Sequence, residues 1–263
     1  MGTLKDKRLC GIIAAVLTAT VFSSISLIVA LNYLEGTPWF IFSSVLRLVF
    51  GLAVLYLLKK LYDREPKEVL RFRNGRETFA AASGFLLYFA YYLIVYAVGA
   101  SGIKGMTAGL LISKVILQQL TTGFYEEILF RGLMCGGYRY TKGGFGRKLG
   151  YALLSSALFG AVHILTGFDL TRFLQTSTIG FAFAVIYLQT DNILLLMILH
   201  FVYDIFANMA GFIVWNKTEI FLAMNSWINA AFGVMFVISV IMLTRKEKVL
   251  RGGKDEDTYT QAR

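Results

Sequence analysis

The residues that could carry out chemistry in this chain are a few ionisable side chains inside long apolar segments. The set comprises Arg47, Lys114, Glu126, Glu127, Arg131, His163, His200 and Asp204. Charged groups are costly to hold in an apolar environment, so each of them is a candidate functional residue. Both histidines of the chain belong to this set, which favours a shared site over two structural histidines.

Six of these residues form three spaced patterns. The patterns are Glu-Glu-x-x-x-Arg at 126–131, Phe-x-x-x-His at 159–163 and His-x-x-x-Asp at 200–204. Residues four apart lie on one face of a helix. We therefore expect Glu127 to pair with Arg131, which anchors the site, and Asp204 to contact His200. By the same spacing, Phe159 should fix the ring of His163 and exclude water from it.

Glu126 is the acid most free to meet water. Adjacent helical residues point about 100° apart, so Glu126 should face away from the pair that Glu127 forms. Steps of four back from Glu126 reach Thr122 and Gln118, and this polar stripe is typical of a helix that lines a wet cavity.

Two chemistries are open to an acid, two histidines and a further carboxylate. In the first, His163, His200 and an acid bind Zn²⁺, whose water becomes a nucleophile near neutral pH. In the second, no metal is needed. Glu126 is then the general base for water, and a histidine with Asp204 stabilises the oxyanion.

The composition places these residues in a membrane protein. The chain has 263 residues, of which 57% are hydrophobic and 16% charged, and its mean hydropathy is +0.63. Soluble proteins average about 25% charged residues, so a soluble enzyme is excluded. The net charge of +10 comes from basic residues between the apolar runs. This distribution indicates contact with anionic membrane lipid rather than with nucleic acid.

The apolar runs predict an all-α, polytopic membrane protein of about eight transmembrane helices. The expected spans are 9–31, 39–58, 79–98, 106–134, 149–166, 173–189, 192–214 and 219–243. With eight spans, 20 Lys and Arg residues lie on the side of the termini and 3 on the other side, which predicts cytoplasmic termini. We expect one transmembrane domain over 1–244, with a motif-bearing core at 106–214, and a polar cytoplasmic tail at 245–263.

The three motifs resemble those of the CPBP family. This family comprises the CaaX prenyl endoproteases of Ras-converting-enzyme type and the bacterial Abi proteins linked to bacteriocin processing and immunity. Motif order and spacing agree over residues 106–214. The resemblance implies that Glu126 activates water and that His163, His200 and Asp204 complete the site. Many members carry Asn where this chain has Asp204. A carboxylate donates a hydrogen bond only when protonated, which favours metal binding or histidine orientation at this position.

From the residues and the resemblance together, we expect an intramembrane peptidase in a prokaryotic plasma membrane. Its substrate would be a membrane-associated protein or peptide, such as a CaaX-type tail or a small exported peptide, reached through a cavity open towards the cytoplasm. One alternative is a transporter that uses the same acids and histidines as a proton relay. Against it, the sequence lacks the paired broken helices and repeated halves of many transporters. The other alternative is a non-catalytic immunity or regulatory partner in the membrane.

Overall fold

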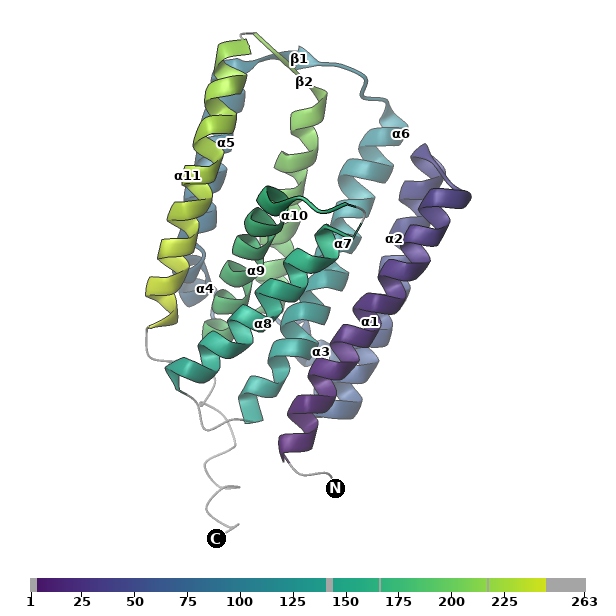
Figure 1. The fold of residues 1–263 in the computed structure, drawn as a ribbon, viewed down its shortest axis with the longest axis vertical. Helices are drawn as coiled ribbons and strands as arrows, with labels where there is room; N and C mark the ends of the chain where they lie inside the picture. Colours follow the sequence, from purple (N-terminus) through teal and green to yellow (C-terminus); the bar gives the residue numbers. More distant parts are fainter. Residues whose placement is uncertain (1–3, 141–143, 166, 217, 245–263) are drawn as a thin grey trace.

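The computed structural model describes residues 4–140, 144–165, 167–216 and 218–244. In these residues the chain is nearly all α-helical (Figure 1), which confirms the predicted fold class. The long helices are α1 (Leu4–Asn32), α2 (Gly36–Tyr62), α5 (Ser83–Gly99), α8 (Phe145–His163), α9 (Leu170–Thr190), α10 (Ile193–Met209) and α11 (Thr218–Leu243). The short helices α3 (Pro66–Val69) and α4 (Gly75–Ala81) lie between α2 and α5. The tail predicted at 245–263 lies outside the described residues.

The segment that carries the first motif is one helical stretch with two changes of winding. Its α-helical parts are α6 (Ala108–Leu110) and α7 (Gln118–Glu127). A π-helical segment, Leu111–Leu117, precedes α7, and a second one, Ile128–Met134, follows it and leads into the 3₁₀ turn Cys135–Tyr140. π-Helical turns often occur at functional sites. Here the second one begins directly after the two adjacent glutamates.

Within the described residues, four helical stretches are long and apolar enough to cross a membrane. They are Lys7–Asn32, Gly36–Tyr62, Ile193–Phe212 and Trp227–Thr244, and the pair α4 and α5, bent by 65°, would make a fifth. A helical stretch lies at each of the eight predicted positions. The number of spans and the side of the termini nevertheless stay predictions, because length and apolarity support only four or five.

The two ends of the bundle differ in structure (Figure 1). The beginning of α1 and the end of α11 lie at one end, which we call the terminal end. The other end, which we call the ribbon end, carries β1 (Ala100–Ile103) and β2 (Ile213–Trp215). These strands pair antiparallel and so join the end of α5 to the end of α10.

The core is built around α9. Its residues from Ile179 to Leu188 are buried, and α9 contacts α8, α11 and α4. The ring of Phe183 stacks on that of Phe85, with 4.4 Å between centroids. The outer faces of α1 and α5 expose large apolar side chains instead, such as Leu31 at 73% and Ile94 at 64%. A soluble protein rarely exposes such continuous apolar surface, and lipid would cover it here.

A buried carboxylate holds the loops of the terminal end together. Asp191, between α9 and α10, is 2% exposed. It accepts hydrogen bonds from Arg64 (3.1 Å), Arg73 (3.2 Å) and Arg139. These arginines follow α2, precede α4 and lie in the 3₁₀ turn, respectively. One acidic side chain therefore fixes three connecting segments relative to α9.

We predict that Asp191→Ala lowers the free energy of unfolding by about 3–5 kcal/mol, because buried Arg64 then lacks its counter-charge. Glu65→Ala is the matched control, since the Lys59–Glu65 pair is 50% and 44% exposed; exposed pairs contribute less than about 1 kcal/mol. Unfolding of both variants in detergent micelles measures the difference. Equal, small losses would show that Asp191 does not hold these loops.

Candidate active site

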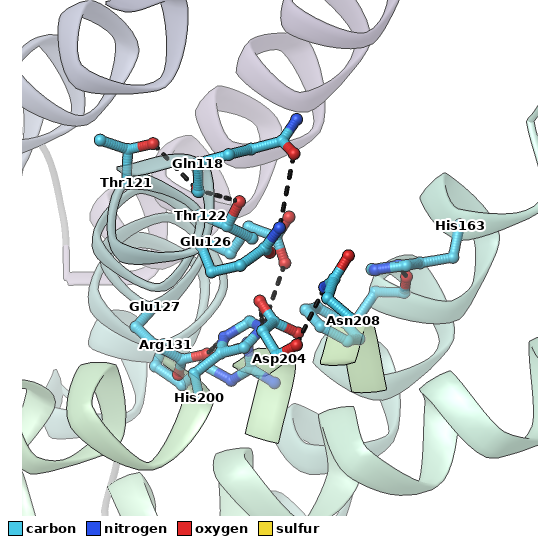
Figure 2. A network of polar contacts seen from close by, with 12 residues as sticks. Gln118, Thr121, Thr122, Glu126, Glu127, Arg131, His163, His200, Asp204 and Asn208 are labelled. Carbon is cyan, nitrogen blue, oxygen red and sulfur yellow. Dashed lines mark hydrogen bonds and ion pairs between the residues drawn. The ribbon is translucent and has the colours of Figure 1, made fainter. Parts of the chain in front are cut away.

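Glu127, Arg131 and His200 lie close together in the buried polar network (Figure 2). Glu127 Oε1 accepts one hydrogen bond from Arg131 Nη1 at 3.0 Å and another from His200 Nδ1 at 2.7 Å. The side chains of Glu127 and Arg131 are both 0% exposed. The predicted pairing of Glu127 with Arg131 is confirmed. The contact with His200 was not predicted, because it joins α7 to α10.

Arg131 extends the network to α9 and α8. Its Nη2 donates to the carbonyl of Gly180 at 3.1 Å, and its guanidinium carbon lies 4.7 Å from the ring centroid of Phe159 and 5.2 Å from that of Phe183. A Cβ at Gly180 would lie 3.1 Å from Phe159 Cβ. The glycine therefore lets α9 approach closely enough for its carbonyl to bind the arginine.

His200 is held between carboxylates. Opposite the Nδ1 that binds Glu127, its Nε2 lies 3.6 Å from Asp204 Oδ2 and 3.8 Å from Glu126 Oε2. The predicted contact between His200 and Asp204 is confirmed. Carboxylate oxygens beside both ring nitrogens favour the doubly protonated imidazolium, which donates from each nitrogen. A protonated His200 and Arg131 together offset two of the three carboxylates, of which Glu126 and Glu127 are buried.

Glu126 faces a cavity of about 250 Å³ that His163 also lines. Glu126 is 8% exposed, and its Oε2 has no hydrogen-bond partner among the described residues. Gln118 and Thr122 are buried and bond to Ser43 Oγ and to the Gln118 carbonyl, respectively. Of the predicted polar stripe, only Glu126 lines the cavity.

His163 lies apart from the network around Glu127, at the end of α8 (Figure 2). Its Nδ1 is 2.7 Å from the Phe159 carbonyl. A carbonyl only accepts, so Nδ1 carries the proton and Nε2 is left available. The two rings are 4.6 Å apart, which confirms the predicted contact. His163 therefore contributes to the site through the cavity it shares with Glu126.

Two arginines complete the cavity wall: Arg47 of α2 and Arg172 in the first turn of α9. Arg47 donates to the carbonyl and the hydroxyl of Ser43, and its guanidinium carbon is 5.4 Å from the Phe22 ring centroid. The sequence already indicated Arg47 as a candidate functional residue, because it lies in the middle of a predicted apolar span. Arg172 carried no such signal, because it lies outside the predicted spans.

The cavity lies in the half of the bundle towards the ribbon end. It is lined by Ala30 in the last turn of α1, Trp39 in the first turn of α2 and Arg172, all of which belong to turns remote from the terminal end. The expectation of a cavity open towards the cytoplasm stays a prediction, because it depends on the side of the termini. At the terminal end α1 packs closely on the segment after α7, where Tyr62 donates to the Leu133 carbonyl.

The residues present do not fit the predicted zinc site. The described part of the chain contains no group of three or more His, Cys, Asp or Glu side chains that could hold a metal ion. His200 faces Glu127 through one nitrogen and Asp204 through the other. His163 is bonded instead to the Phe159 carbonyl of its own helix, α8. In the described residues, the two histidines and an acid therefore do not form a three-ligand group.

Gly123 allows α7 and α10 to approach closely, since a Cβ there would lie 3.0 Å from the Met197 carbonyl oxygen and 3.6 Å from His200 Cβ. We predict that Gly123→Ala pushes α10 away from Glu127 and costs about 1–3 kcal/mol of stability. Gly150→Ala in α8 is the control, because its Cβ meets nothing within 4 Å. That control should gain up to about 1 kcal/mol. Thermal unfolding in detergent compares them, and a neutral Gly123→Ala would contradict the prediction.

Comparison with known families yields one match. Residues 108–206 match the family model for Rce1-like type II CAAX prenyl endopeptidases. Neither the curated proteins nor the solved structures gave a match. The matched region runs from the start of α6 into α10 and contains the three motifs. Over residues 108–206 the chain is therefore similar to the Rce1-like type II CAAX prenyl endopeptidases, and this similarity is consistent with the CPBP resemblance.

Proposed function

We propose that the protein is an intramembrane endopeptidase in which Glu126 activates water to hydrolyse a peptide bond of a membrane-associated substrate. One observation carries the proposal. Glu126 is a buried carboxylate on a cavity wall, and its Oε2 lacks a hydrogen-bond partner among the described residues. An unpartnered buried carboxylate oxygen is costly, and a water molecule bound in the cavity would satisfy it.

In the proposed reaction, Glu126 takes a proton from that water as the oxygen attacks the peptide carbonyl carbon. His163 Nε2 accepts the second water hydrogen and so holds the nucleophile in line. When the tetrahedral intermediate collapses, the C–N bond breaks and Glu126 passes its proton to the leaving amine. One water is consumed, and one new carboxyl group and one new amino group form.

Arg47 provides the positive charge for the oxyanion in this scheme. It lines the same cavity as Glu126, and its Nε has no hydrogen-bond partner among the described residues. Donors aimed at developing negative charge in a dry site are among the largest contributions to catalysis. An ionised Asp204 has no proton to donate, so we assign it to orienting His200 instead.

Glu127, Arg131 and His200 position the catalytic carboxylate. Glu127 and Arg131 neutralise each other, and His200, placed 3.8 Å from Glu126, helps to hold that acid in position at the cavity. This contact with His200 supports the role proposed for Glu126. The substrate would be a CaaX-type tail or a small exported peptide.

We predict that Glu126→Gln lowers the hydrolysis rate by about 10²–10⁴-fold, as expected for the loss of a general base. The amide has the shape of the acid, so the variant should fold and insert. The exposed Glu77→Gln is the matched control. Mass spectrometry of peptides from membranes of cells carrying each protein, or none, measures the products. An unchanged product pattern with Glu126→Gln would exclude a peptidase and favour a non-catalytic membrane partner.

We also propose that hydrolysis is independent of a bound metal, because His163 lines the cavity whereas His200 does not, and no group of three possible ligands occurs in the described residues. Purified protein treated with EDTA or phenanthroline should keep its activity. Metal analysis should find less than one zinc ion per chain. One zinc ion per chain that is lost in His163→Ala, together with inhibition by the chelators, would contradict this proposal.

A further inference from the structure

One face of α1 forms a wall of the cavity and consists mainly of small side chains. Ala19, Ser23, Ser26 and Ala30 all line the cavity and follow the spacing of a single helical face. Leu31, the residue after Ala30, is 73% exposed. We call these four residues the small face of α1. They leave space in front of Glu126 that larger side chains would fill.

Unpartnered polar groups along this space indicate a polar ligand. At its inner end, Glu126 Oε2 is buried without a hydrogen-bond partner among the described residues, and Ser26 Oγ is in the same state. At its outer end, the exposed side chain of Arg172 lines the cavity and forms no ion pair within the described ranges. A ligand with hydrogen-bonding groups and one negative charge would satisfy all three.

We propose that the substrate reaches Glu126 from the ribbon end, as an extended polypeptide that lies along the small face of α1 and pairs a carboxylate with Arg172. This proposal rests on the proposed peptidase function. A helix is about 10 Å wide and has its backbone groups bonded internally. It neither fits a cavity of about 250 Å³ nor presents its carbonyls to Glu126, whereas an extended strand does both.

The side of access also selects between substrate classes. Arg172 is one of the 3 basic residues on the side opposite the termini in the eight-span arrangement, against 20 on the side of the termini. That asymmetry predicts that the terminal end faces the cytoplasm. The ribbon end then faces outwards. Access from that side favours a small exported peptide, or the outer segment of a membrane protein, as the substrate.

Side-specific cysteine labelling of the full chain tests the access route without requiring turnover. Native Cys10 is exposed and is replaced by Ser, while Cys135 is buried and is kept. Exposed Lys67→Cys marks the terminal end and exposed Lys104→Cys the ribbon end. Ala30→Cys probes the cavity. Intact spheroplasts and sealed inverted vesicles are treated with a membrane-impermeant maleimide.

Ala30→Cys should react in the preparation that labels Lys104→Cys, and a bulky label there should block hydrolysis. Labelled Leu31→Cys, which points away from the cavity, should stay active. Labelling of Ala30→Cys together with Lys67→Cys, or in neither preparation, would overturn the access route. If hydrolysis did not depend on Glu126 but the labelling pattern were as expected, the proposed peptidase function would fail while the access route would stand.

Arg172→Gln tests the carboxylate, with a quenched fluorescent peptide used as the free acid and as the C-terminal amide. The KM for the acid should rise about fivefold, which is the upper range for an exposed ion pair, and the KM for the amide should not change. Lys104→Gln, a cation at the same end but outside the cavity lining, should leave both values unchanged. An equal effect of Arg172→Gln on acid and amide would overturn the proposed pairing.

Discussion

The structure depends on the pairing of charges that have no access to water. Glu127 Oε1 is shared by Arg131 and His200, and each of these partners brings a different helix to α7. In an apolar interior an unpaired charge costs several kcal/mol, so α7, α9 and α10 must keep the arrangement in which these groups meet. The glycines at 123 and 180 allow the required approach of the backbones.

This pairing separates two adjacent carboxylates into different roles. Glu127 is fully buried and accepts hydrogen bonds from Arg131 and His200. Glu126 points about 100° away and lines the cavity. His200 contacts both acids and so links the supporting network to the carboxylate proposed as the base. The chain thus places Glu126 on the cavity wall, with Arg47 on the same wall and His200 3.8 Å away.

The two ends of the bundle follow opposite designs. At the terminal end, Asp191 binds three arginines and the helices pack closely. At the ribbon end, small residues on α1 leave the cavity between α1, α2 and α8. Helices that pack closely at one end and leave a cavity at the other determine the end from which the site is reached. Hydropathy alone does not reveal this difference.

The sequence by itself determined the all-α class, the positions of the helical stretches, and the contacts of Glu127 with Arg131, Phe159 with His163 and His200 with Asp204. These follow from helical periodicity, which is local. Only the tertiary structure decided the bond between Glu127 and His200 and the bond from Arg131 to the Gly180 carbonyl. It also placed His163 away from the network around Glu127 and decided the end at which the cavity lies. Such features depend on how closely particular helices pack, because side-chain volumes and buried charges from distant segments set those distances together.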